Sequence, residues 1–244
     1  MNDRRTQGVM LLAVGATALW LGVSSAALSY VRSALRLPLA VSGLVLLTVA
    51  LATLWPRQAA PDDDGHGHGE HGPRSGWLLV LPVLVLLLVS PPALGSYAAS
   101  RQAPRAGGPS GPFPSLPAAV DGAVPMPVSE FVSRALYDQR HSLTGARVRL
   151  VGFVTPDDQG GRDYLLARFN FFCCAADAEV YELVVRGDAT ARRSDQWLQV
   201  EGRWQPQPVS KGIAPSTRRP VLLVDSVTPV SPPRDRYEHN LYAV

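Results

Sequence analysis

The chain has 244 residues, a formal net charge of +3 and a hydrophobic fraction of 46%. That fraction would suit a soluble globule, but the apolar residues gather in the N-terminal half. This distribution excludes a simple soluble domain and is typical of membrane spans followed by a soluble part.

Three apolar runs in the first hundred residues predict transmembrane helices. Each approaches the roughly 20 residues that a hydrocarbon core of about 30 Å requires, and none carries an interior charge. Aromatic rings lie at or near their ends, where amphipathic side chains prefer the membrane interface. The sequence therefore predicts a multi-pass helical membrane region at 1–98, with spans at 8–30, 38–55 and 77–94.

The first run leaves an alternative open, and the orientation of the spans is harder to predict. Arg4 and Arg5 before it and small residues at 24–27 also fit a cleaved signal peptide, although its apolar core is at the upper length limit. The Arg and Lys residues near the span ends tie between the two sides of the membrane. Because the first segment usually dominates, Arg4 and Arg5 favour a cytoplasmic N-terminus and an extracytoplasmic C-terminal domain.

A polar loop at 56–76, between the second and third runs, contains three of the five histidines. Imidazole binds zinc, copper, nickel and iron(II) at neutral pH, and the neighbouring carboxylates add oxygen donors. A solvated loop whose histidines bind nothing is the alternative. We expect the loop to contact zinc or another transition metal through His66, His68 and His71.

A Pro/Gly-rich linker is predicted at 99–127, followed by a small domain at 128–244. Ser129 is the expected N-cap of one short amphipathic helix. Five segments of strand character follow, and Gly152 and Gly202 fall inside strands, where a barrel must bend. The predicted fold is a mainly-β, OB-like five-stranded barrel with a short helix, its strands at 147–154, 164–172, 180–186, 197–204 and 221–227.

An OB-like barrel raises the question of nucleic-acid binding, which charge excludes. From Val128 onward the chain has 15 Arg and Lys against 14 Asp and Glu. This balance lacks the basic surface that phosphate binding requires. We therefore expect no nucleic-acid partner.

Both cysteines, Cys173 and Cys174, are adjacent in the segment FNFFCCAADA. They could form a strained vicinal disulfide, bind a soft metal or metalloid together, or point to opposite faces of a strand with only one buried. Asp177 and His141 could complete a metal site. Because unprotected thiols outside the cytoplasm oxidise, we expect a role beyond packing, with one thiol in the core and its neighbour accessible.

No motif of a hydrolase, a metalloprotease or a phosphate-binding loop is present, so we expect no enzyme activity. The whole pattern, and CCAADA at 173–178 above all, resembles the YcgQ-like bacterial proteins, a family of permease subunits in two-component systems. The resemblance implies a separate polytopic permease as partner.

Together these features predict a membrane-anchored accessory subunit of a permease, linked to transition-metal or metalloid transport. The expected metal ligands are His66, His68, His71, Cys173, Cys174 and Asp177. A stand-alone envelope protein that uses the cysteines for thiol redox chemistry or metal carriage is the rival, and a non-catalytic envelope scaffold is a third possibility.

Overall fold

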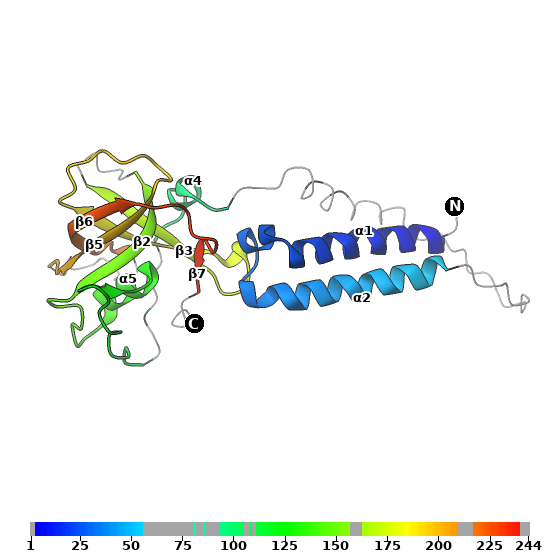
Figure 1. Ribbon diagram of the computed structural model, residues 1–244, viewed down its shortest axis with the longest axis horizontal. Coiled ribbons are helices and arrows are strands. Elements are labelled where there is room, and N and C mark those ends of the chain that lie inside the picture. Colours follow the sequence, from blue (N-terminus) through cyan, green and yellow to red (C-terminus); the bar gives the residue numbers. More distant parts are fainter. Residues whose placement is uncertain are drawn as a thin grey trace, which may run out of the picture. The chain divides into compact units, whose positions relative to one another are not determined.

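The computed structural model describes residues 3–55, 81, 85, 93–104, 108, 111–156, 163–208 and 217–239. The chain divides into two compact units, Met1–Pro92 and Ala93–Val244. Figure 1 shows a helical hairpin in the first unit and a β-barrel in the second.

The first unit contains two long helices, α1 (Asp3–Val23) and α2 (Arg36–Leu54), joined by the short turns η1 (Ser25–Ser29) and η2 (Ser33–Leu35). Within the described residues, two segments are long and apolar enough to cross a membrane: Arg5–Val23 and Ser33–Leu54. Of the third predicted span, Leu81 and Val85 are described and helical. Ala93 and Leu94, at its predicted end, are also described, but they are not helical and belong to the second unit. The rest of that span and the histidine loop lie outside the described residues.

Small residues allow α1 and α2 to pack closely. A Cβ atom built on Gly43 would lie 2.5 Å from the backbone nitrogen of Leu19, and one on Gly22 would lie 2.7 Å from that of Ala40. Glycine at such positions lets helix backbones approach each other, as at the interfaces of transmembrane helices. Arg36 then donates hydrogen bonds to the carbonyls of Gly22 and Val23, where α1 ends.

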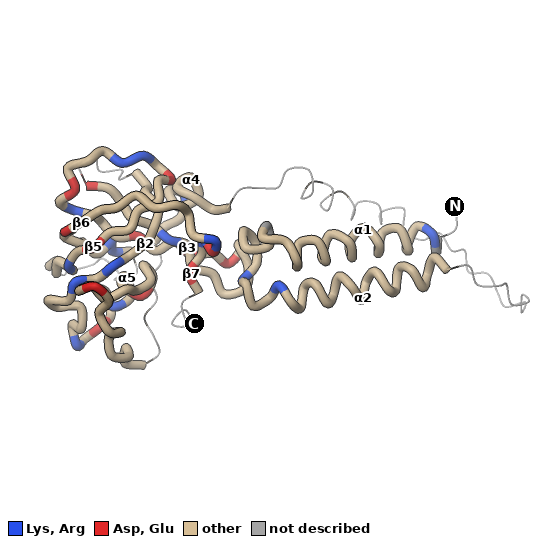
Figure 2. Tube along the Cα trace, in the orientation of Figure 1, with Lys and Arg blue, Asp and Glu red and all other residues tan. Residues whose placement is uncertain are grey.

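The outer surface of this hairpin is apolar. Trp20, Leu37, Val41 and Leu44 are exposed large side chains on the two helices. Figure 2 shows that the charges of α1 and α2 lie only near helix ends, whereas the second unit carries charges of both signs. A continuous exposed apolar surface of this kind needs apolar surroundings, which is compatible with membrane anchoring.

The second unit is a closed five-stranded barrel. Its main strands pair in the order β2-β5-β6-β4-β3, and β3 returns to β2 to close the barrel. All these pairs are antiparallel except β4 with β6, and this arrangement is consistent with the OB-like fold that the sequence predicts. The strands are β2 (Arg147–Thr155), β3 (Tyr164–Asn170), β4 (Glu179–Arg186), β5 (Trp197–Gln205) and β6 (Val221–Pro229).

Both glycines expected at bends lie where the sheet must curve. The register between β5 and β6 shifts at Glu201/Gly202, where a Cβ would collide with the carbonyl of Leu223. A Cβ on Gly152 would lie 2.8 Å from the carbonyl oxygen of Ala167 on β3. The barrel interior is filled by inward-facing apolar residues, including Val148, Leu150, Leu166, Leu183, Leu198, Val200 and Leu222.

Helix α5 (Val128–Tyr137) packs on β2, β3 and β4. Its N-cap is Pro127, so the prediction of Ser129 as N-cap is wrong. The carboxylate of Glu238, on the short strand β7 (Tyr237–Glu238), instead accepts hydrogen bonds from the amides of Val128 and Ser129, both at 2.8 Å. This long-range cap leaves Ser129 fully buried inside the first turn of the helix.

The second compact unit begins at Ala93, well before the predicted domain start at 128. The short helix α4 (Ser96–Ala99) is held by Asp195, whose carboxylate accepts hydrogen bonds from the backbone and hydroxyl of Ser96. Phe113, in the predicted linker, is buried with the guanidinium of Arg134 over its ring. The described parts of the predicted linker therefore pack on the barrel unit, and the short strand β1 (Val124–Pro125) pairs with β2.

Candidate metal centre

The cysteine pair lies in the connection between β3 and β4, beyond the end of the strand at Asn170. Phe171 is the buried residue of this connection, and its ring packs 4.5 Å from that of Tyr237. Cys173 is exposed and Cys174 is partly exposed. The prediction that one thiol faces the core is therefore wrong, because the alternation of a strand no longer applies after Asn170.

The two thiols and one carboxylate form a compact donor cluster. The Sγ atoms of Cys173 and Cys174 are 3.7 Å apart, and both cysteines are free. One ligand atom from each of Cys173, Cys174 and Asp177 lies within 4.8 Å of the others. The structure thus brings together three of the six predicted ligands.

The local backbone fixes the carboxylate of Asp177. A single turn, η4 (Ala175–Asp177), follows Cys174, so the chain folds back and points Asp177 at the amides before the turn. The carboxylate accepts hydrogen bonds from the backbone amides of Phe172, Cys173 and Cys174 at 3.1, 2.9 and 3.5 Å. The amides of three consecutive residues therefore hold the negative charge of Asp177 next to both thiols.

This carboxylate controls the protonation of Cys173. The hydrogen bond to Asp177, supported by one to Cys174, raises the pKa of the Cys173 thiol to about 12. Partial burial raises the pKa of Asp177, but the Cys173 thiol and three backbone amides outweigh it and hold that pKa below its usual value. The ionised carboxylate of Asp177 therefore favours the neutral thiol form of Cys173.

The donor set and its spacing suit a soft divalent metal. Sulfur ligands about 2.3 Å from a tetrahedral zinc ion lie about 3.8 Å from each other. The observed separation of 3.7 Å between the two sulfurs is close to that edge. A cation would take the place of the thiol proton between sulfur and carboxylate, with Asp177 as the oxygen ligand.

His141 is not part of this cluster. His141 lies in the loop after α5, where its ring stacks on Trp204 with centroids 6.1 Å apart. It does not belong to the cluster that the described residues form, so it does not complete this site. The histidine-loop ligands His66, His68 and His71 lie outside the described residues.

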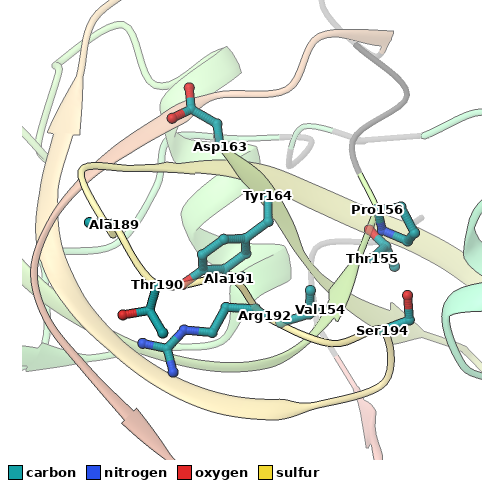
Figure 3. A pocket seen from close by; sticks show the side chains of 10 residues that line it. All are labelled: Val154, Thr155, Pro156, Asp163, Tyr164, Ala189, Thr190, Ala191, Arg192 and Ser194. Atoms are coloured by element: carbon teal, nitrogen blue, oxygen red, sulfur yellow. The ribbon is translucent and has the colours of Figure 1, made fainter. Parts of the chain in front are cut away.

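Sequence reasoning missed a pocket of about 620 Å³ at one end of the barrel, between β2, β3 and the β4–β5 connection. Figure 3 shows the ring of Tyr164 next to the side chain of Arg192 in the lining of this pocket. The carboxylate of Asp188 accepts hydrogen bonds from Tyr164 Oη at 3.1 Å and Arg192 Nε at 2.7 Å. No spacing motif links these three residues in the sequence, so no signal could have identified the pocket.

The charged groups at this pocket neutralise each other. Burial, and then Asp188, raise the pKa of Tyr164. Burial raises the pKa of Asp188, but its hydrogen bond with Arg192 outweighs this and lowers that pKa overall. Neither group therefore titrates near neutral pH, as a general acid or base would need to do.

Comparison with known proteins connects the barrel to one family. Residues 130–240 match the family model described as the DUF1980 C-terminal domain. This match supports a DUF1980-like or YcgQ-like family, as the sequence resemblance implies.

Other comparisons add little. No curated protein matches the chain. One solved structure, of a proposed aspartyl-tRNA synthetase from Leishmania major Friedlin, is 13% identical over 56% of this chain, with a TM-score of 0.29. The chain covers only 25% of that protein, and a similarity this low carries no conclusion about fold or function.

Proposed function

We propose that the protein is a membrane-anchored accessory subunit of a permease and that it serves the transport of a transition metal or metalloid. The family match at 130–240 is consistent with an accessory or membrane protein. The two apolar helices of the first unit would supply the anchor. The barrel would then present the ion-binding cluster to the permease.

The single observation that carries the proposal is the cluster of Cys173, Cys174 and Asp177. Thiolates select soft ions such as zinc, copper(I) and iron–sulfur species over magnesium and calcium. Because the cluster lies on an exposed connection of the barrel, an ion can enter and leave without the barrel opening. This combination suits delivery better than permanent structural binding, since structural zinc sites are usually closed.

The proposed topology has three spans and a cytoplasmic N-terminus, with the third span in the predicted run that starts at 77 and ending before Ala93, where the second unit begins. The barrel with its cysteines would then lie outside the cytoplasm, and the loop containing His66, His68 and His71 would lie inside. Two sets of metal donors on opposite sides of one membrane are what a transport system needs. The histidine loop would bind the ion weakly, since its glycines impose little backbone preference.

A thiol-redox protein is less well supported. A redox-active cysteine needs a thiolate, and such cysteines usually have a pKa lowered by a nearby positive charge or a helix N-terminus. Here the carboxylate of Asp177 raises the pKa of Cys173 instead. The site therefore stabilises a protonated thiol until a cation replaces the proton.

Metal accumulation in cells tests the proposed function. A strain lacking the protein should accumulate an altered amount of one transition metal or metalloid, measured by elemental analysis after growth across metal concentrations. The wild-type chain should restore that amount, and the variant with Cys173→Ser and Cys174→Ser should not. Full restoration by the double variant, produced at the same level in the membrane, would overturn the proposal.

A further inference from the structure

Among the described residues, the donors around the cysteine pair are too few to enclose a tetrahedral ion. On the basis of the proposed function, we infer that a divalent ion at Cys173, Cys174 and Asp177 keeps one open coordination position. A thiolate or imidazole of the transport partner fills that position when the ion is handed over. The site is thus a transfer site with a defined partner chemistry.

The cluster offers fewer ligands than a closed zinc site. Within the described residues, the cluster contributes two sulfurs and one carboxylate oxygen, whereas a structural zinc site is normally closed by four protein ligands. His239 lies near the same connection, because its ring packs edge-on against Phe171 at 5.2 Å. It is not one of the residues whose ligand atoms form the cluster, however, and its Nε2 lies 3.0 Å from the Asp235 carboxylate.

The cysteine pair is accessible from solvent. Cys173 is exposed, and Phe172 beside it is 70% exposed although the preceding Phe171 is buried. An exposed aromatic ring next to an ion site offers apolar contact area to an approaching protein. The donor of the partner could therefore reach the ion from the solvent side without moving the barrel.

The carboxylate of Asp177 is held in a fixed position. Asp177 is held by three backbone amides, so its carboxylate does not need to reorient when the coordination of the ion changes. The incoming donor would form its bond to the ion first, and one cysteine sulfur would then release the ion and take a proton from water. Only ligands exchange in this step, and no oxidant or reductant is required.

Cobalt(II) is a suitable probe, because its visible spectrum reports both thiolate ligation and coordination geometry. Full-length, detergent-solubilised, reduced protein would receive one equivalent of cobalt(II) and then be titrated with imidazole. The same titration on the variant with His66, His68 and His71 replaced by Ala removes the imidazoles of the loop. We expect a thiolate-to-cobalt charge-transfer band and a saturable, imidazole-dependent shift of the d–d bands in both proteins.

Transfer kinetics supply an independent readout. The rate at which zinc passes from the protein to excess chelator should rise in proportion to chelator concentration, because the chelator can bind the ion before a cysteine releases it. A rate that is independent of the chelator concentration, together with d–d bands that imidazole does not change, would overturn the open coordination position. The proposed metal site would then still stand.

The remaining outcomes separate the two proposals. An imidazole effect seen only in the triple histidine variant would show that the histidines of the chain itself fill the position, which would overturn a partner donor. Absence of the charge-transfer band would mean that the thiols bind no divalent metal, and it would overturn the proposed function together with this inference.

Discussion

At the scale of single residues, Asp177 determines the chemistry of the cysteine pair. Its carboxylate accepts the thiol proton of Cys173 in a hydrogen bond and raises the pKa of that thiol to about 12. The same carboxylate would be an oxygen ligand once a cation displaces the proton. One side chain thus favours the neutral thiol of Cys173 and completes the donor set.

Replacing Asp177 by Asn should make Cys173 more reactive. Removing the negative charge lowers the pKa of the thiol, so more thiolate is present at a given pH, and thiolate is the form that iodoacetamide alkylates. We expect alkylation of Cys173 at pH 8 to become faster by on the order of tenfold or more. Mass spectrometry of the labelled peptides measures the rate, and Asp121→Asn, at an exposed carboxylate paired only loosely with Arg149, is the control. An unchanged rate would show that Asp177 does not control the thiol.

The exposure of the two cysteines could not be predicted from the sequence. The aromatic run before the cysteines suggested a strand that continues to 172, but pairing of β3 with β4 ends at Asn170. The adjacency of two thiols and a carboxylate three residues later could be read from the sequence. Their exposure could not, because it depends on the turn η4, whose hydrogen bonds have no distinctive sequence signal.

At the scale of elements, Glu238 ties α5 to the barrel. Its two carboxylate oxygens accept hydrogen bonds from two backbone amides at the start of the helix. Arg168 lies 3.6 Å from one of these oxygens and forms a buried ion pair with Glu238. Anions stabilise helix N-termini, and breaking a buried pair leaves an uncompensated charge. The cap connects residues more than 100 positions apart in the chain, which is why the sequence suggested the local candidate Ser129 instead.

Replacing Glu238 by Ala should loosen α5. We expect the free energy of unfolding of the barrel unit to fall by about 3–5 kcal/mol, because Arg168 loses its buried partner and two amides lose their acceptor. Hydrogen exchange of the α5 and β3 amides in the full-length protein measures the change. Glu238→Gln should be milder, since its amide oxygen can still accept a hydrogen bond, and Asp121→Asn should have almost no effect. Equal protection in the Ala variant and the wild type would exclude a capping role.

The close packing of α1 against α2 should stabilise the helical hairpin. Gly43→Leu should separate the helices, because even a Cβ there would meet the backbone of Leu19. Size-exclusion chromatography of detergent-solubilised protein after graded heating should show earlier loss of the folded species. The adjacent Leu44, which is exposed, supplies the matched control as Leu44→Ala. If both variants survive heating equally, close helix contact does not stabilise the hairpin.

All five main strands lie within two residues of their predicted bounds, because runs rich in apolar, β-branched and aromatic residues end where turn residues begin. The order of the strands and the closure of β3 on β2 depend on long-range pairing. They followed from the sequence only by analogy with OB-like barrels.

At the scale of the whole molecule, the proposed topology has three spans and an extracytoplasmic barrel. A reporter that is active only outside the cytoplasm should be active when fused after Val244 and silent when inserted near Gly69. The first unit supplies two candidate spans within the described residues, so the third span is what places the two reporters on opposite sides. Equal activity of both fusions would exclude the third span, and the reverse pattern would place the cysteines in a reducing compartment.

Metal binding by the intact protein tests the central claim most directly. Full-length protein, solubilised in detergent with its thiols reduced, should be titrated with zinc in a calorimeter, in the variant that replaces His66, His68 and His71 by Ala. We expect one zinc ion per chain, and we expect that binding to disappear when Cys173→Ser and Cys174→Ser are added, while hydrogen exchange of the barrel stays unchanged. Zinc binding that persists with both cysteines replaced, or no binding while they are intact and reduced, would contradict the assignment of this cluster as a metal centre.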